Sequence, residues 1–408
     1  MPFDAQNKVA IVGVGQSNIG RKLARPIGLL ALDASLAAIS DAGLKVSDID
    51  GLSTFPDGEG AGVGPVPGES SAPFQWMVQA LGIERVDWWA TGGGNISTAI
   101  GYAIQALATH SCTYALVWRA MYQPRGGGFG SGARPVVGRS SSAGPPQAAR
   151  DSAYTAPYGL AGAPIAFAPA YMRYMKKYGA KREHMAAYVL AARGHANKNP
   201  YAVFYDEPLT FEDYMSARMI SDPLCLYDCD MPIDGAAAIV LTRADRARDL
   251  KQPPAYVTAF GSAGWNWRLR PPEEYEDNAA NVGRTLWAST HLTHKDIAGA
   301  MLYEGFSPDI YWWLEGLGFC KKGEAYEWIQ NGRIALGGEL PVNTFGGSLS
   351  EGRLHGIGHW VEGVKQVQGR ADDKPGDGAR QIPNAEHVMV VTGMTGHGVG
   401  VILSRDPV

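Results

Sequence analysis

The chain has 408 residues, of which 45% are hydrophobic, and it can therefore bury one large core or two fused cores, which excludes a disordered or fibrous protein. Its 36 basic and 40 acidic residues are interspersed and give a formal net charge of -4, so no positive field is available to hold nucleic acid. Residues 1–7 carry no basic leader, and no apolar run reaches membrane-spanning length, so we expect a cytoplasmic protein without a membrane span.

The first predicted elements are a strand, a glycine cluster, a helix and a second strand. Residues 8–15 form an apolar run that ends in glycine, which predicts a buried strand leading into a tight turn. The cluster from Gly92 to Gly94 precedes a helix-period segment at residues 96–108 and an apolar run at residues 114–118. This order is typical of a βα unit.

Between residues 123 and 162 the composition changes to Gly, Pro, Ser and Ala. The segment is too long and too poor in apolar residues to connect elements inside a compact core, so we interpret it as a loop excursion that covers or borders the site. Its arginines are either phosphate ligands or solvated charges on a flexible loop. They are Arg125, Arg134, Arg139 and Arg150.

Charges and turn formers at residues 243–254 separate a second half, which repeats the plan of the first. Its parts, in order, are an apolar run ending in glycine at residues 255–261, the pair Gly346 and Gly347, a helix-period segment at residues 354–367 and an apolar run at residues 388–391. An internal duplication is the simplest account of this repetition. It predicts a layered α/β fold with a pseudo-twofold axis.

Common cofactor and metal motifs are absent from the sequence. Residues 13–18 lack the third glycine of a dinucleotide fingerprint, and no GxxxxGK[ST] phosphate loop or G-x-S-x-G elbow occurs. Cys225 and Cys229 have no matching Cys or His pair nearby, and the four cysteines are too few for a disulfide framework, so we expect reduced, structural thiols. We therefore expect no metal and no separate cofactor.

Short motifs recur in a fixed order over most of the chain. They lie at residues 31–50, 193–200, 220–223, 234–238, 341–347 and 349–356. In order and spacing they resemble the thiolase superfamily, in particular its sterol-carrier-protein or lipid-transfer branch. This resemblance implies an α/β thiolase fold of five layers, αβαβα, built from two duplicated halves. The halves are residues 1–248, which include the loop at 123–162, and residues 249–408.

The same resemblance locates the four groups that thiolases use, and all four are changed in this chain. The nucleophilic cysteine position falls at or beside Gly93, within residues 91–95, and a glycine cannot carry an acyl group. The Asn-Glu-Ala-Phe loop corresponds to Tyr-Glu-Gly-Phe, which begins at Tyr303. The histidine position falls on Arg353, with His355 two residues later, and the second cysteine position falls on Thr392.

Without the cysteine, the remaining chemistry is a retro-aldol cleavage, which needs a base and an oxyanion site but no covalent carrier. We predict Tyr303 as the acid/base, with its ordinary pKa of ~10 lowered by Arg353 or His355, and His355 as a second catalytic residue. The alternatives are a packed tyrosine, a turn-capping histidine and an Arg353–Glu351 pair. The predicted substrate-binding residues are Gly92, Gly93, Gly94, Asn95, Gly346, Gly347, Arg353, Thr392 and His397.

Within the superfamily the chain resembles the bacterial steroid side-chain aldolases, which lack the cysteine. The resemblance implies a lyase that cleaves a β-hydroxyacyl-CoA thioester of a steroid side chain into a ketosteroid and a short acyl-CoA. It also implies a homodimer that binds a small DUF35-type OB-fold protein in a heterotetramer. These aldolases use tyrosine hydroxyls, whereas residues 341–408 contain no tyrosine, so the second acid/base group stays unassigned.

Two other functions remain open at this point. One is a non-catalytic acyl-CoA or lipid-binding protein, because the loss of four catalytic groups is also the mark of a degenerate enzyme. The other is a β-ketoacyl-CoA thiolase with a displaced nucleophile, for which Cys112 and Cys320 are the candidates.

Overall fold

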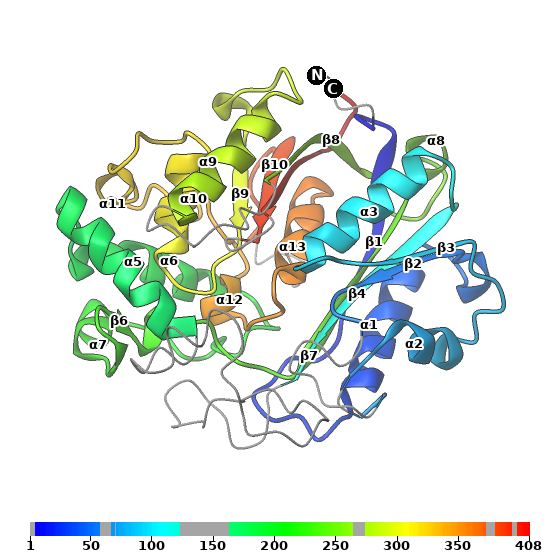
Figure 1. The fold of residues 1–408 in the computed structure, drawn as a ribbon, viewed down its shortest axis with the longest axis horizontal. Coiled ribbons are helices and arrows are strands. Elements are labelled where there is room, and N and C mark those ends of the chain that lie inside the picture. Colours follow the sequence, from blue (N-terminus) through cyan, green and yellow to red (C-terminus); the bar gives the residue numbers. More distant parts are fainter. Residues whose placement is uncertain are drawn as a thin grey trace, which may run out of the picture.

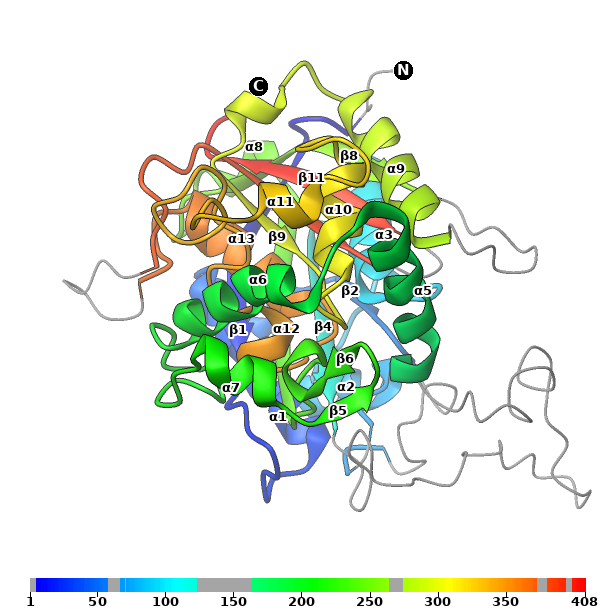
Figure 2. The same cartoon turned by 90° about the vertical axis from the view of Figure 1, so that its left-hand side faces the viewer.

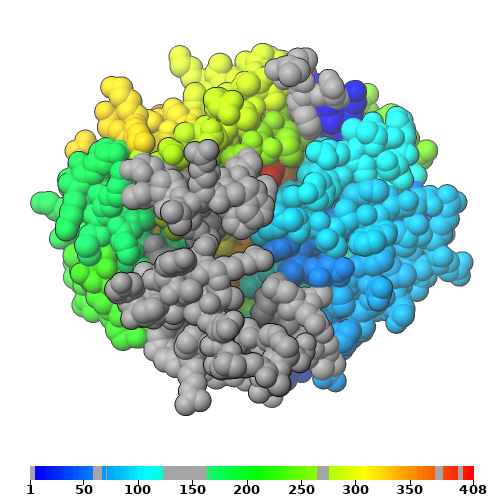
Figure 3. All heavy atoms as spheres, viewed as in Figure 1, coloured from blue at the N-terminus to red at the C-terminus, as the bar shows by residue number. Residues whose placement is uncertain are grey.

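The computed structural model describes residues 5–57, 67–69, 71–122, 163–263, 274–372, 380–393 and 398–408. The predicted loop excursion at residues 123–162 lies outside the described residues. The N-terminal part, blue to cyan, and the green segment at residues 163–216 lie on opposite sides of the molecule (Figure 3). The two ends of the chain lie together at one edge (Figure 1), where Asn7 and Val408 exchange hydrogen bonds of 2.6 and 3.1 Å.

Nine strands form one mixed sheet in the order β3-β2-β4-β7-β1-β8-β11-β10-β9. They are β1 (Val9–Gln16), β2 (Gly51–Thr54), β3 (Trp88–Thr91), β4 (Tyr114–Met121), β7 (Gly235–Arg243), β8 (Ala255–Ser262), β9 (Gly299–Leu302), β10 (His387–Thr392) and β11 (Val399–Ser404). A separate pair consists of β5 (Met219–Ser221) and β6 (Leu224–Cys225). The four strands predicted from apolar runs are confirmed as β1, β4, β8 and β10.

The sheet repeats one topology in its two halves. In the first half β2 pairs parallel with β4, and β4, β7 and β1 follow as antiparallel neighbours. In the second half β9 pairs parallel with β10, and β10, β11 and β8 follow in the same antiparallel way. The halves join through an antiparallel contact between β1 and β8, with Ala10 opposite Tyr256. The predicted internal duplication is therefore confirmed.

Twelve helices lie within the described residues. They are α1 (Ile27–Asp41), α2 (Phe74–Leu81), α3 (Ile96–Ala108), α5 (Ala163–Tyr178), α6 (Arg182–Ala196), α7 (Phe211–Ser216), α8 (Ala244–Ala247), α9 (Glu274–Trp287), α10 (Asp309–Gly316), α11 (Ala325–Trp328), α12 (Gly347–Ser350) and α13 (Ile357–Val367). The sequence-based boundary after residue 248 falls between α8 and β8 and stays a prediction.

Three hydrophobic cores divide the molecule into five layers. One core joins α1 to the outer face of β4 and β7, and another joins α9 and α10 to the outer face of β8 and β10. The third core contains α3 and α13 between the inner faces of both halves of the sheet. Figure 1 shows the layers in sequence from α9 and α10 through the central pair α3 and α13 to α1. The predicted αβαβα arrangement is confirmed.

The segment between β4 and β7 adds the helices α5, α6 and α7. They lie together on one side of the molecule (Figure 2), where α5 and α6 pack against the core of the second half. Tyr171 and Tyr174 of α5, for example, have their rings 6.3 and 5.2 Å from the ring of Tyr311 in α10.

None of the helices within the described residues is both long and apolar enough to cross a membrane.

Gly15 and Gly261 have a different role from the predicted tight turn. Each is the second-last residue of its strand, β1 or β8, and still within the sheet. A Cβ atom on Gly15 would overlap the carbonyl oxygen of Ala34 in α1, and one on Gly261 would overlap the backbone of Leu286 in α9. The glycines are therefore required because a helix lies directly on the strand in each half.

The predicted helix at residues 354–367 begins later, at Ile357. The residues just before it have left-handed backbone conformations, with φ of +140° at Gly352, +55° at His355 and +102° at Gly356. A helix cannot pass through such residues, so residues 352–356 form a loop that leads into α13.

We predict that Gly15→Ala and Gly261→Ala each lower the free energy of unfolding by at least about 2 kcal/mol, because the added methyl group overlaps backbone atoms. Gly194→Ala is the matched control, since no atom of the residues that the structure describes lies within 4 Å of the added Cβ at this exposed position of α6, and helix propensity favours alanine there. Denaturant unfolding of the three variants measures the difference. Equal stability of all three would contradict this account of the strand glycines.

Candidate active site

The four thiolase-like positions converge on one end of the central layer. Inward-facing residues of a strand alternate, so Arg119 of β4, Thr392 of β10 and Tyr303, directly after β9, all point to the side of α3 and α13. A Cβ on Gly356, which precedes α13, would lie 3.3 Å from Thr392 and 3.5 Å from Ile96 of α3. The N-termini of both central helices therefore meet at the ends of these strands.

A cavity of about 180 Å³ lies at this meeting point. Of the predicted site residues, it is lined by Gly94, Asn95, Tyr303, Arg353, His355 and Thr392. Both halves of the chain thus contribute to one site. His397 lies outside the described residues, as do the four loop arginines.

The glycine cluster shows what replaces the nucleophile. Among the described residues, a Cβ on Gly93 would have only the Tyr102 hydroxyl, at 3.8 Å, within 4 Å, so these residues leave room there for a side chain, which glycine lacks. Gly92 has no such room, because a Cβ there would lie 2.6 Å from the Asn95 carbonyl oxygen. Asn95 caps α3 by accepting a 3.0 Å hydrogen bond from the Thr98 amide. Gly92 and Gly93 do not line the cavity.

Tyr303 shares its surroundings with two buried carboxyl groups that the sequence motifs did not reveal. All three side chains lie around Gly305. A Cβ atom placed on Gly305 would be 3.6 Å from the Tyr303 hydroxyl oxygen and 3.9 Å from one carboxyl oxygen of Asp230 and one of Asp309. Both acids line the cavity, and they are 4% and 1% exposed. The Tyr303 backbone is fixed by hydrogen bonds to Val391 and from Trp313, of 2.8 and 2.9 Å.

Burial determines which of these groups ionises near neutral pH. It raises the pKa of Asp230 to about 6, against the opposing effect of Arg353, whose Nε lies 3.5 Å from a carboxyl oxygen. Burial and the Asp230 charge raise the pKa of Tyr303 above its ordinary value, and Arg353 offsets this only in part. The predicted lowering of the Tyr303 pKa is therefore wrong, because desolvation outweighs the nearby positive charge.

Asp309 is a second buried acid of the cavity, at the first residue of α10. Its Oδ2 accepts hydrogen bonds from the amides of Gly305 and Phe306, at 2.9 and 3.3 Å. Burial nevertheless raises the pKa of Asp309 well above its ordinary value.

Arg353 pairs with Asp230 rather than with Glu351. The Glu351 carboxylate instead accepts hydrogen bonds from Gln16 and Asn199.

His355 lines the cavity in contact with a buried arginine. Its Nδ1 lies 3.3 Å from Nη2 of Arg119, and its ring stacks on Phe55 with centroids 6.3 Å apart. Burial, with the charges of Arg119 and Arg353, lowers the pKa of His355 well below its ordinary value. The imidazole is therefore neutral at physiological pH. A single charged residue inside the apolar strand β4 was the sequence signal for Arg119.

Gly346 and Gly347 lie beneath the cavity rather than on its surface. A Cβ on Gly347 would overlap the carboxylate of Glu304, which is 0% exposed and accepts hydrogen bonds from His359 and Asn343 at 2.9 and 3.0 Å. Gly347 therefore makes room for a buried polar network directly behind Tyr303, whereas a Cβ on Gly346 would overlap Ala196 at the end of α6. Thr392 also has a structural partner, since its hydroxyl hydrogen-bonds to Ser97.

None of the four cysteines lines this cavity. Burial raises the pKa of Cys112 to about 12 and also raises the pKa of Cys320, so neither candidate forms a reactive thiolate at neutral pH. The geometry thus gives no support to a displaced nucleophile.

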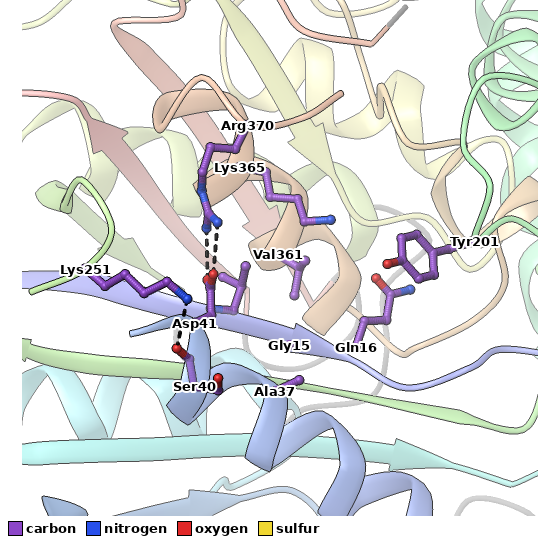
Figure 4. Close-up of a pocket in the computed structure, with 11 residues that line it drawn as sticks. Gly15, Gln16, Ala37, Ser40, Asp41, Tyr201, Lys251, Val361, Lys365 and Arg370 are labelled. Atoms are coloured by element: carbon purple, nitrogen blue, oxygen red, sulfur yellow. Dashed lines mark hydrogen bonds and ion pairs between the residues drawn. The ribbon is translucent and has the colours of Figure 1, made fainter. Parts of the chain in front are cut away.

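A larger cleft of about 460 Å³ lies elsewhere, between β1, the end of α1 and α13 (Figure 4). Arg370 forms two 2.9 Å hydrogen bonds with Asp41 at its edge, and the Lys251 ammonium lies 3.4 Å from the Ser40 carbonyl oxygen. The two cavities share no lining residue. None of the predicted site residues lines this cleft, so the smaller cavity is the candidate active site.

Comparison with known proteins agrees with this geometry. The thiolase C-terminal domain-like family model matches residues 270–405. A 17-hydroxy-3-oxo-4-pregnene-20-carboxyl-CoA lyase of Mycobacterium tuberculosis is 35% identical, covering 97% of this chain and 99% of that protein. A steroid side-chain-cleaving aldolase of Thermomonospora curvata is 34% identical, covering 97% of this chain and 98% of the relative. The solved Ltp2-ChsH2(DUF35) aldolase superposes with a TM-score of 0.83 at 31% identity and 98% coverage of both chains. The chain belongs to the thiolase-like family that contains these steroid side-chain-cleaving aldolases.

Proposed function

We propose that this protein is a carbon-carbon lyase that cleaves a β-hydroxyacyl-CoA thioester of a steroid side chain by a retro-aldol reaction. The products are a ketosteroid and a short acyl-CoA, and no covalent intermediate forms. The main support is the cavity, where a phenol and an ionisable carboxyl group lie together while the nucleophile position holds Gly93. The names of the relatives describe the same class of reaction.

In the proposed reaction, the proton of the substrate β-hydroxyl group passes through the Tyr303 hydroxyl to Asp230. The electron pair of the O–H bond forms the new carbonyl group, and the pair of the breaking Cα–Cβ bond forms a thioester enolate. Asp230 then returns the proton through Tyr303 to Cα. No atom or electron enters from outside, so the reaction requires no separate cofactor, and CoA takes part only within the substrate.

The ionisation of the two groups fits this exchange. With a pKa of about 6, Asp230 is mostly ionised at neutral pH and accepts a proton readily. Tyr303 keeps its proton because its pKa is raised, so it can donate to Asp230 while it accepts from the substrate. The donors available for the enolate oxygen are His355 and the amides at the N-terminus of α3.

We further propose that the protein binds a small DUF35-type OB-fold protein, because the name of its solved relative joins the aldolase to a DUF35 protein. We also propose that it binds CoA thioesters, because the name of the Mycobacterium tuberculosis relative contains a carboxyl-CoA compound. We propose a homodimer whose subunits contact each other through β3. This strand lies at one edge of the sheet and leads directly into the glycine cluster. Trp89 of β3 is 56% exposed, although an aromatic side chain on a sheet edge is normally covered by a partner.

We predict that Tyr303→Phe lowers kcat/KM about 100-fold or more in the presence of the neighbouring DUF35-type protein, because the proton path to Asp230 is broken. Mass spectrometry of a β-hydroxyacyl steroid-CoA and its products measures the rate. Tyr326→Phe in α11 is the matched control and should retain wild-type activity. Tight binding of the CoA ester by wild type, with no cleavage of any side-chain length, would instead favour the non-catalytic binding function.

We predict that kcat/KM falls as the pH is lowered through about 6, because Asp230 must be ionised to accept the proton and its pKa lies near that value. Asp230→Asn should lose most activity, and its residual rate should lack this acidic limb. Asp206→Asn, at an exposed position, serves as the control with an unchanged profile. Persistence of the limb in Asp230→Asn would assign it to another group.

We predict that Trp89→Asp converts a dimer to a monomer, because the charge would be buried at the proposed β3 interface. Light scattering after size-exclusion chromatography measures the mass. Phe211→Asp places the same charge on another exposed aromatic position, which is 42% exposed, and should leave the dimer intact. A monomeric wild-type protein at micromolar concentration would refute the dimer.

A further inference from the structure

We propose that Arg119 is a positioning residue that holds His355 as a neutral hydrogen-bond donor, with its proton on Nε2, toward the thioester oxygen of the substrate. The proposal rests on the retro-aldol function above, where His355 is already a donor for the enolate oxygen; it adds the tautomer of His355 and a role for Arg119. The sequence motifs singled out His355 alone, as an acid/base or activating group. In the structure its partner is a cation rather than a carboxylate.

Arg119 is a buried cation that pairs with no carboxylate within the described part of the chain. Its side chain lies on the inward face of β4, and the residue is 7% exposed. Among the described residues it forms no ion pair with a carboxylate; Nη1 donates to the Ala120 carbonyl oxygen at 3.1 Å, and Nη2 contacts His355. An uncompensated buried charge is costly. Its position behind His355, which lines the cavity, fits a negative charge that develops nearby during the reaction.

The contact between Arg119 and His355 determines the tautomer of the histidine. A guanidinium group has only donors, so Nδ1 of His355 must accept the 3.3 Å hydrogen bond from Nη2. A neutral imidazole with an accepting Nδ1 carries its proton on Nε2. Among the described residues Nε2 has no hydrogen-bond partner, and His355 lines the cavity. The nitrogen available to substrate is therefore a donor.

The groups around His355 keep the imidazole neutral. Four side chains lie around it. They are Arg119 of β4, Arg353 of the same loop, Tyr303 directly after β9, whose ring is T-shaped to the imidazole, and Phe55 directly after β2. Two of these neighbours are cations, and they and burial lower the pKa of His355 well below its ordinary value. The pKa of Arg119 is lowered only to about 9, so the guanidinium remains charged at neutral pH.

The orientation of the ring is also constrained. Phe55 stacks on the imidazole, and the Arg119 guanidinium lies 5.5 Å from the centre of the same Phe55 ring. The backbone of His355 has a φ of +55°, a conformation that a residue other than glycine keeps only where the surroundings enforce it. Such a fixed donor stabilises an enolate oxygen without reorganisation during the reaction.

The proposed step is a change in hydrogen bonding rather than a proton transfer. As the Cα–Cβ bond breaks, its electron pair moves onto the thioester and the oxygen becomes negative. The Nε2–H of His355 donates to this oxygen, and the positive charge of Arg119 behind the ring strengthens the donor. The proton stays on Nε2, so Asp230 and Tyr303 remain the groups that exchange the proton.

The test is nitrogen NMR of the protein labelled with ¹⁵N-histidine, in complex with its DUF35-type partner, with His355→Gln used to assign the signals. We expect an unprotonated Nδ1 and a protonated Nε2 for His355 at every pH from about 5.5 to about 8.5. In Arg119→Met this signature should be replaced by mixed tautomers or by titration. A wild-type His355 that carries its proton on Nδ1, or that titrates near its ordinary pKa of about 6.5, would overturn the proposal.

Kinetics provide the second readout. Arg119→Met should lower kcat about tenfold to 100-fold with little change in KM, because the donor acts on charge that develops during the reaction. Arg119→Lys retains a cation that donates to Nδ1 and should recover part of the rate and the wild-type NMR signature. Arg85→Met, at a side chain that is 79% exposed, is the matched control with unchanged kcat. Unchanged kcat in a folded Arg119→Met protein would contradict the proposal.

Failure of the proposed function gives a different result. If no hydroxyacyl-CoA is cleaved by wild type but His355 shows the protonated Nε2, the lyase assignment fails while the tautomer assignment stands. If Arg119→Met does not fold, Arg119→Lys and the wild-type NMR spectrum still decide the outcome.

Discussion

Desolvation of charged groups at the meeting point of the two halves is the constraint on which the site depends. In water Asp230 would be fully ionised at neutral pH, and His355 would titrate near it. Burial raises the pKa of the acid to about 6 and lowers that of the histidine far below neutrality. The same burial keeps Tyr303 protonated. The cavity therefore holds one carboxylate that accepts a proton and two neutral hydrogen-bond donors, and no cysteine lines it.

The fold creates this environment by symmetry. The duplicated topology brings the inward-facing ends of β4 and β10, and the residue that follows β9, to the N-termini of α3 and α13. Each half supplies polar groups that lie buried where the two halves meet. Arg119 comes from the first half, and Tyr303, Arg353 and His355 come from the second. A buried network of Glu304, His359 and Asn343 supports Tyr303 from behind.

Much of this arrangement was predictable from the sequence, because apolar runs and ordered motifs report strands, helices and the duplication. Motif spacing also placed Tyr303, Arg353, His355 and Thr392 in one site. Spacing does not report which groups approach a glycine, so Gly346 and Gly347 were expected at the cavity, although Gly346 lies against Ala196 and Gly347 makes room for Glu304. Asp230 and Asp309 carried no motif signal, and only the packing shows that they approach Tyr303. The sign of the Tyr303 pKa shift likewise depends on burial, which a motif cannot report.

The central claim is that the reaction proceeds without a covalent carrier, and intact-protein mass spectrometry tests it most directly. The enzyme and its DUF35-type partner are mixed with a β-hydroxyacyl steroid-CoA, without free CoA, and quenched during turnover. We predict an unmodified protein mass together with equal amounts of ketosteroid and short acyl-CoA. A protein that gains the mass of an acyl group, or product formation that requires free CoA, would contradict the account.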